Sequence, residues 1–377
     1  MKIAFISNYL NAPCTMFYWE ALSSIDGIYL NPSQTAPDHS YDHYDIALFM
    51  TYPDDLNEMR RVKKKVPNIT TGLIDPRGSH IKAYIPYADF LIVDSLEMKD
   101  FFSNFKRPIF QYYEYPKLER KVKNHFFKKK TIIAYHGNSV HLASMYPNIT
   151  HAIETLSEKY DIEFWAMYNI KQQGKCKLGT PNNIPVKHIQ WHQDNYYKYL
   201  AKADIGIVPN MMPIKKINKF KMKACVYKSY FNDSLDDYLI RFKMPSNPGR
   251  LIVFGMMGIP VVTDFYPSAL QFIKDEQNGM LAYSMGGWHT ALEKLILSPA
   301  LRQKLSFNMF KTIDQYFDFD KQNLKFLSFL ENIVEQEKSN NDYLREPGED
   351  ISSNYHFWKA MIIQKLHKVK NKFLQGN

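Results

Sequence analysis

The stretch from Lys243 to Val262 reads K-M-P-S-N-P-G-R-L-I-V-F-G-M-M-G-I-P-V-V and decides how the rest of the chain is interpreted. Pro248 and Gly249 are residues that favour a turn. The apolar positions from 250 to 257 suit a helix packed against a sheet. The β-branched run that follows, at 261–263, favours a buried strand. The stretch therefore predicts a loop, a helix and a strand in succession.

The polar end of this stretch is a candidate anion site. Ser246, Asn247, Gly249 and Arg250 lie where the loop meets the start of the predicted helix. The first N–H groups of a helix have no partners within the helix, and the dipole is positive there. Ordinary capping by Ser246 or Asn247 is the structural alternative.

Length and composition set the broad class. A chain of 377 residues predicts two domains, and 45% hydrophobic with 23% charged residues is typical of a soluble globular protein. The net charge of +10 favours an anionic partner. No ordered basic and aromatic reader motif is present, so nucleic acid is not the expected partner.

The cysteines and the apolar runs predict the cellular compartment of the protein. Cys14, Cys176 and Cys225 are widely spaced and form no disulfide framework or zinc pattern, which fits a reducing cytosol. The N-terminus starts as a strand and not as a signal peptide. No apolar run of about eighteen residues occurs, so no membrane span is expected. These features predict a cytoplasmic protein.

Strands alternate with helices in two successive halves of the chain. The first half has expected strands at 2–7, 46–50, 69–74, 88–93 and 108–112; the second at 131–135, 162–167, 186–191, 205–209 and 261–263. This rhythm predicts an α/β fold with two doubly wound parallel sheets that face a central cleft. The expected domains are 1–127 and 128–319, followed by a crossover helix at 320–336 and a tail at 337–377.

Ligands of open parallel sheets bind beyond the carboxyl ends of the strands. Polar residues that follow strands are therefore the site candidates. They are Asn8, Asp75, Arg77, His80, His136, Asn138, His141, Asn210, Ser246, Asn247 and Arg250.

The order of parts resembles that of the GT-B glycosyltransferases. Gly255-Met256-Met257-Gly258-Ile259-Pro260-Val261-Val262 resembles the helix end and strand of the retaining nucleotide-sugar enzymes of the family 4 type. The preceding K-x-x-S-N-P-G-R is similar to a loop variant of surface-polysaccharide transferases. A-D-I-G-I-V-P at 203–209, N-G-M-L-A at 278–282 and the helix at 289–305 match further motifs in the same order.

Several positions depart from the family pattern. The two glutamates of the family signature would fall at Pro245 and Val253, and neither residue is acidic. Gln271 stands where a glutamate near the donor is frequent. The basic pair expected after the first strand of the second domain is replaced by H-G-N-S-V-H, which starts at His136.

The resemblance and the chemistry of phosphate recognition together suggest roles. A planar guanidinium suits phosphate oxygens, so Arg250 is the expected β-phosphate ligand. The expected donor-binding residues are Asn138, Asn210, Lys243, Ser246, Asn247, Gly249, Arg250 and Gln271. The expected acceptor-binding residues are Asn8, Arg77 and His141. Lys215, Lys216 and Lys219 could add charge, although a solvated surface is the favoured interpretation of that lysine-rich run.

Asp75, His80 and His136 are the candidate catalytic residues. Asp75 or His80 would act as general base if the enzyme inverts. If it retains, as the resemblance implies, the leaving phosphate takes the acceptor proton. The acidic pairs at 236–237 and 318–320 look like helix or turn residues, so neither a metal nor another cofactor is expected.

The tail predicts a basic amphipathic helix at 355–373 after a polar linker. Apolar residues recur there at helical spacing, and the remainder carries five lysines and no acid. Such a helix suits an anionic membrane surface, with packing on the N-terminal domain as the alternative.

The functional expectation is a glycosyltransferase that moves a sugar from a nucleotide-sugar donor to a glycan or glycolipid acceptor. Lipooligosaccharide, capsule or O-antigen is the acceptor that the resemblance implies, with the enzyme peripheral on the cytoplasmic membrane. The alternatives are a nucleotide-sugar epimerase or phosphosugar transferase on the same fold, or a binding module without catalysis.

Overall fold

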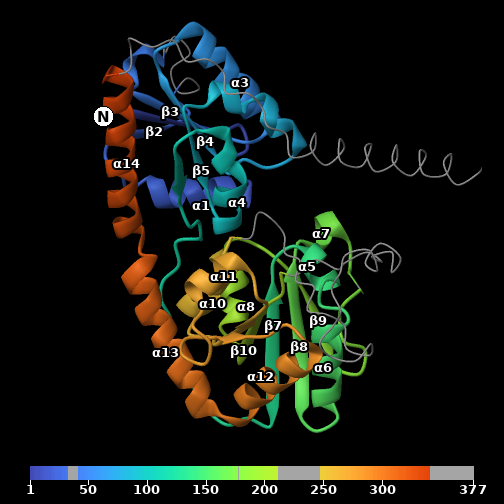
Figure 1. The fold of residues 1–377 in the computed structure, drawn as a ribbon. Coiled ribbons are helices and arrows are strands. Elements are labelled where there is room, and N and C mark those ends of the chain that lie inside the picture. Colours follow the sequence, from blue (N-terminus) through green and yellow to red (C-terminus); the bar gives the residue numbers. More distant parts are fainter. Residues whose placement is uncertain (33–40, 177, 211–246, 340–377) are drawn as a thin grey trace, which may run out of the picture.

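The computed structural model describes residues 1–32, 41–176, 178–210 and 247–339. Within them the chain forms two domains, each built on a six-stranded parallel sheet (Figure 1). The predicted pair of doubly wound α/β domains is confirmed. Lys243, Ser246, the lysine-rich run at 213–228 and the amphipathic segment at 355–373 lie outside the described residues.

The N-terminal sheet has the order β2-β1-β3-β4-β5-β6. Its strands are β1 (Ile3–Ile6), β2 (Ile28–Leu30), β3 (Ile46–Met50), β4 (Thr70–Ile74), β5 (Phe90–Val93) and β6 (Ile109–Gln111). The sequence pattern did not predict β2, which has only three residues and lies at an edge, where Tyr29 is exposed. The chain adds β2 on one side of β1 and β3 on the other, so the topological switch point lies between β1 and β3.

Helices cover both faces of this sheet. One face packs α3 (Pro53–Lys65), α4 (Leu96–Phe102) and the 3-10 turns at Ser79–Ala83 and Ile85–Tyr87. The other packs α1 (Pro13–Leu22) together with α14 (Phe319–Ser339), which runs up from the second domain (Figure 1). Phe326, Leu330 and Ile333 of α14 join the core of this face. Two further 3-10 turns are Tyr41–His43 and Ser103–Phe105.

The C-terminal sheet has the order β12-β11-β10-β7-β8-β9. Its strands are β7 (Lys130–His136), β8 (Asp161–Tyr168), β9 (Val186–Gln190), β10 (Ile205–Val208), β11 (Val261–Thr263) and β12 (Met280–Leu281). After β7 the chain builds outward through β8 and β9, and then crosses to β10 on the other side. The switch point therefore lies between β7 and β10, which pair Ile133 with Ile205.

Helices also cover both faces of the C-terminal sheet. Those on one face are α8 (Tyr196–Leu200), α10 (Gly249–Met256) and α11 (Pro267–Phe272). Those on the other are α5 (Ser139–Ala143), α6 (Asn148–Ser157) and α12 (Met285–Leu297). α13 (Pro299–Tyr316) contributes to both cores, and α7 (Ile170–Gln173) is a short turn beyond β8. No helix in the described ranges combines the length and apolarity that a membrane crossing requires.

Glycines allow α10 to pack closely on its neighbours. A Cβ at Gly206 of β10 would lie 2.7 Å from the Phe254 ring, and one at Gly255 would lie 2.6 Å from Cγ of Met309 in α13. The helix ends before Gly258, whose φ of +66° favours glycine. The apolar stretch that suggested the fold is thus a buried helix held between a strand and α13.

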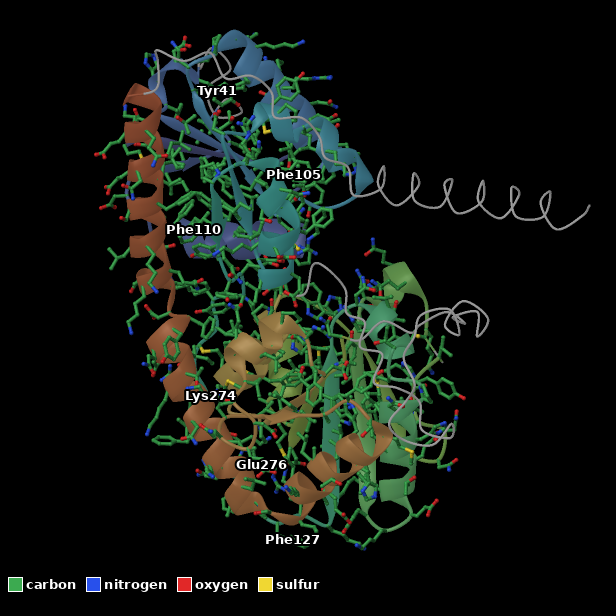
Figure 2. All side chains as sticks on the ribbon, viewed as in Figure 1. Tyr41, Phe105, Phe110, Phe127, Lys274 and Glu276 are labelled. Atoms are coloured by element: carbon green, nitrogen blue, oxygen red, sulfur yellow. The ribbon has the colours of Figure 1, made fainter. Side chains whose placement is uncertain are left out.

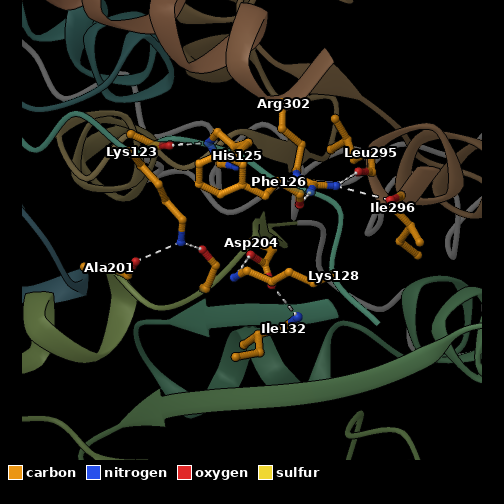
Figure 3. A network of polar contacts seen from close by, with 12 residues as sticks. Lys123, His125, Phe126, Lys128, Ile132, Ala201, Asp204, Leu295, Ile296 and Arg302 are labelled. Carbon is orange, nitrogen blue, oxygen red and sulfur yellow. Dashed lines mark hydrogen bonds and ion pairs between the residues drawn. The ribbon is translucent and has the colours of Figure 1, made fainter. Parts of the chain in front are cut away.

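The segment that leads from the first domain to β7 is fastened to the C-terminal domain (Figure 3). Lys123 donates to the carbonyl of Ala201 at 2.8 Å, and Nε2 of His125 lies 2.9 Å from the carbonyl oxygen of Gly258. Arg302 donates to the carbonyl of Phe126 at 2.7 Å. Burial lowers the pKa of His125 to about 4, so this side chain is neutral at physiological pH.

Candidate active site at the switch points

Arg250 lies at the switch point of the C-terminal sheet. Its Nη1 donates to the carbonyl of Pro209 at 3.1 Å, and its Nη2 donates to Oδ1 of Asn210 at 3.0 Å, both just beyond β10. A Cβ at Gly137, just beyond β7, would lie 3.1 Å from Cδ of Arg250. The side chain therefore crosses from the end of β7 to the end of β10.

The group beside Arg250 has spare hydrogen-bonding capacity. Nδ2 of Asn210 is buried and has no hydrogen-bond partner among the described residues, while its backbone N–H donates to Asp264 at 2.6 Å. A guanidinium carries five N–H donors, so the two contacts above do not exhaust its capacity. A buried amide that lacks a partner is costly unless a ligand or water supplies one. Arg250 and Asn210 together form a donor-rich site for an anion.

The start of α10 differs from the expected row of free amides. The N–H of Gly249 donates to Oδ1 of Asn247 at 2.8 Å, and the N–H of Leu251 donates to the carbonyl of Pro248 at 2.8 Å. Pro248 is the N-cap residue of α10, and Asn247 directly before it accepts the first N–H of the helix. The hydrogen-bond donors that remain available in this region are therefore mainly those of the Arg250 side chain, not those of the helix terminus.

His136 ends β7 beside this site. It is buried, its ring stands edge-on to Phe254 at a centroid distance of 4.9 Å, and its Nε2 has no partner within the described part of the chain. Burial lowers its pKa to about 3, and the positive charge of Arg250 acts in the same direction. His136 is therefore a neutral imidazole. Its Nε2 can form one hydrogen bond with a ligand, but the ring does not supply a positive charge.

We expect His136 to remain neutral from pH 8 to pH 5. In an ¹⁵N-histidine NMR titration its ring resonances, assigned by their loss in His136→Gln, should stay constant over this range. The same protein unfolded in urea provides the reference, because every histidine then titrates near a pKa of about 6.5. A His136 midpoint above pH 5 in the folded protein would contradict the assigned burial and charge environment.

Asn138 and His141 have structural roles in this structure. Oδ1 of Asn138 accepts the N–H of Val140 at 3.1 Å and caps α5, and its carbonyl accepts the Tyr135 hydroxyl at 2.5 Å. His141 is a buried residue of α5 in the C-terminal domain. The expected role of His141 in acceptor binding stays a prediction.

Asn8 lies at the switch point of the N-terminal sheet. Its side-chain amide donates to Oδ1 of Asp55 at 2.9 Å, and its backbone N–H donates to the same oxygen at 2.7 Å. Ser7 donates to the other carboxylate oxygen at 2.8 Å. Asp55 therefore joins the loop after β1 to the start of α3 and holds Asn8 at the carboxyl edge of the sheet.

A charged cluster follows the next strands. Arg77 forms ion pairs with Asp75 and with Asp94, the latter at 2.5 Å. Burial opposes the charge on Arg77, but the two carboxylates outweigh this effect and raise its pKa. Asp75 also has φ +54°, and its carbonyl accepts the Thr51 hydroxyl at 2.8 Å. The buried carboxylate of Asp75 is thus held by a cation, and its role as a general base stays a prediction.

Glu114 connects this cluster to the donor side. Burial raises its pKa well above the usual range, and the nearby Asp75 and Asp94 raise it further. Its Oε1 accepts Nδ2 of Asn247 at 3.0 Å, and its carbonyl oxygen accepts the same nitrogen at 3.1 Å. Asn247, which accepts the first N–H of α10, is thus bonded to the end of the first domain.

Two more contacts join the domains. Oε1 of Gln271 accepts the Tyr113 hydroxyl at 2.7 Å, so this predicted donor-binding residue is bonded to the first domain in this structure. Glu97 of α4 accepts hydrogen bonds from the N–H of Ser268, at 3.0 Å, and from the hydroxyl of the same residue.

His80, a candidate catalytic residue, is an exposed residue of a 3-10 turn.

The site therefore contains residues that the sequence interpretation omitted. Asp55, Asp94 and Glu114 all follow strands of the first sheet, and the rule that nominated Asn8 and Asp75 applies to them equally. Their carboxyl groups face partners that are remote in sequence, which no local pattern reveals. No group of three or more His, Cys, Asp or Glu side chains within the described ranges has the arrangement of a metal site.

By sequence the chain matches no protein-family model and no curated protein. Solved structures share its architecture. Anabaena Alr3699/HepE in complex with UDP has a TM-score of 0.57 at 13% identity, over 88% of this chain and 100% of that chain. The same protein in complex with UDP and glucose has a TM-score of 0.58 at 12% identity, with the same coverage.

Two further proteins share the fold. S. aureus TarM, crystallised with fondaparinux, alpha-GlcNAc-glycerol and UDP, has a TM-score of 0.53 at 11% identity, over 75% of this chain. The present chain spans only 55% of the TarM chain. Sucrose-phosphate synthase from Thermosynechococcus elongatus has a TM-score of 0.52 at 11% identity, over 78% of this chain and 74% of its own. These similarities establish the GT-B architecture.

Proposed function

We propose that this chain is a glycosyltransferase that takes a sugar from a nucleotide-sugar donor. The observation that carries the proposal is the place of Arg250, at the switch point between β7 and β10 with Asn210 beside it. A guanidinium and an amide donor converge there on the position where open parallel sheets bind phosphorylated ligands. That structures of the same fold were solved with UDP supports a nucleoside diphosphate as the ligand.

The chemistry follows from stabilising the leaving group. Cleavage of the sugar–phosphate bond places negative charge on the β-phosphate, and fixed donors aimed at that charge lower the barrier. Arg250 supplies the charge, Asn210 an additional N–H, and neutral His136 a hydrogen bond. In the retaining reaction that we propose, the leaving phosphate accepts the acceptor proton, so no metal and no protein base is required.

The acceptor side of the proposal uses the first domain. Asn8 at its switch point and the Asp75–Arg77 pair offer hydrogen-bonding groups to sugar hydroxyls. By resemblance to surface-polysaccharide enzymes, we propose a lipooligosaccharide, capsule or O-antigen glycan as acceptor. The enzyme would work in the cytoplasm, at the membrane surface, with the segment at 355–373 as an anionic-lipid contact.

A ligand panel tests the donor assignment. The thermal midpoint of the full chain is measured with UDP, GDP, ADP, CDP and dTDP, each with EDTA and with Mg²⁺. A ligand that binds only the native state raises the midpoint by mass action. We expect one nucleoside diphosphate to do so without Mg²⁺. No response to any of the five would contradict the proposal, and a response only with Mg²⁺ would contradict the metal-free part of it.

Turnover then separates the enzyme classes. The sugar nucleotide of the responding base is incubated with and without a glycan acceptor, and release of nucleoside diphosphate is followed. Release that depends on acceptor indicates transfer, whereas conversion of the donor without acceptor indicates an epimerase. Binding of the donor with no conversion under either condition indicates a binding module.

A further inference from the structure

The base of the C-terminal domain carries two adjacent exposed phenylalanines. Phe126 is 65% exposed and Phe127 is 76% exposed. Phe127 lies at the end of the second domain that is remote from the first (Figure 2). Single exposed apolar side chains are ordinary, but two adjacent large rings held in solvent indicate a contact surface.

The rings are held outward by a rigid backbone. His125, directly before them, is buried and bonded to the carbonyl of Gly258 at 2.9 Å. Arg302 donates to the carbonyl of Phe126 at 2.7 Å and to that of Ile296 at 3.2 Å (Figure 3). The same guanidinium therefore joins this loop to the end of α12, where Leu297 is 53% exposed.

Lysines follow the phenylalanines directly. Lys128, Lys129 and Lys130 are all exposed. Lys128 pairs with the buried Asp204 at 2.6 Å, and Lys130 approaches Glu163 at 3.9 Å. Among the described residues no carboxylate forms an ion pair with Lys129. We call the set Phe126, Phe127, Lys128, Lys129, Lys130 and Leu297 the base patch.

We propose that the base patch docks on an anionic bilayer surface, with the rings of Phe126 and Phe127 at the headgroup level. Aromatic rings flanked by lysines match an interface that is apolar beneath and negatively charged above. The long stem of Lys129 allows its ammonium group to reach phosphates while the rings enter the interface.

This surface is independent of the donor site. Lys130 begins β7 and His136 ends it, so the base patch and the Arg250 site lie at opposite ends of that strand. Seven strand residues span roughly 23 Å at about 3.3 Å per residue. Docking through the base patch therefore leaves the donor site uncovered.

Vesicle co-sedimentation of the full chain tests the proposal. Vesicles of phosphatidylcholine with phosphatidylglycerol are compared with phosphatidylcholine alone, and Phe126→Ser/Phe127→Ser is compared with wild type. We expect at least tenfold weaker association of the double variant with the anionic vesicles. The matched control is Phe307→Ser/Leu324→Ser, which removes two other exposed apolar side chains, 56% and 69% exposed, and should bind as wild type does.

The possible outcomes distinguish docking through the base patch from other contacts. Wild-type affinity of Phe126→Ser/Phe127→Ser would overturn the proposal, as would wild-type protein that binds neither vesicle. Loss of binding only on removal of 354–377 would assign the contact to the tail instead. A change from dimer to monomer in light scattering, without vesicle binding, would make the patch an interface between copies. Nucleoside diphosphate binding, measured in parallel, should be the same in all these variants, which separates this proposal from the proposed function.

Discussion

Arg250→Ala is expected to lower kcat/KM for nucleotide-sugar turnover by about 10²–10³-fold, which is the usual effect of removing one donor to developing negative charge. The side chain spans the ends of β7 and β10, and no second arginine or lysine bonds to Asn210 within the described residues. The loss should be larger for the nucleoside diphosphate than for the monophosphate, because the predicted contact is to the β-phosphate. Steady-state kinetics and calorimetric titration measure both quantities.

The control for Arg250→Ala is Arg61→Ala. Arg61 is half exposed on α3, and within the described part of the chain its ion pair is with Glu58 three residues before it, so its removal should leave turnover unchanged. Arg250→Lys keeps the charge but loses the planar fork, and we expect an intermediate loss. Near-wild-type turnover of Arg250→Ala, with the thermal midpoint preserved, would rule out the proposed phosphate contact.

Arg77→Met is expected to destabilise the first domain by about 2–3 kcal/mol. Removing one partner of a buried ion pair leaves its charge uncompensated, which typically costs about 3–5 kcal/mol. The lower value reflects the exposure of Arg77, a third of whose side chain contacts solvent, while Asp94 is fully buried. Urea unfolding followed by circular dichroism gives the change.

The pH dependence of the stability of Arg77→Met shows whether lost charge pairing causes the destabilisation. Without Arg77 the buried negative charge of Asp94 lacks its partner cation, and protonation relieves that cost. The loss of stability relative to wild type should therefore be smaller at pH 5 than at pH 8. Arg77→Met/Asp94→Asn, which removes both charges, should recover part of the loss. A deficit independent of pH would point to lost packing instead.

Periodicity and turn residues were sufficient to predict most elements. The apolar run after Gly249 forms α10, and the β-branched residues at 261–263 form β11, because a helix or strand that is buried has few polar positions. Prolines mark the starts of two helices: α1 begins at Pro13, and α11 begins at Pro267. In both cases proline occupies the first turn, where its missing N–H costs nothing.

The candidate site was predicted only in part. Arg250 and Asn210 were nominated separately, as residues after a loop and after a strand, and the structure brings them within 3.0 Å. Asn247 and Gln271 were expected to contact the donor, but in this structure each is bonded to the first domain. Their partners, Glu114 and Tyr113, are more than 130 residues away in sequence, so no local pattern connects them.

The amino-acid pattern alone was enough to establish two parallel α/β domains, because the spacing of apolar residues reflects which face of each strand and helix is buried. It also placed polar residues at the carboxyl ends of strands, since that position follows from strand direction. Which of these residues meet, and which carboxyl groups become buried beside one another, depended on the packing of the two sheets. Burial and pairing arise from contacts between distant segments, and these contacts determine that His136 is neutral, that Asp75 is paired with Arg77, and that Arg250 faces the switch point.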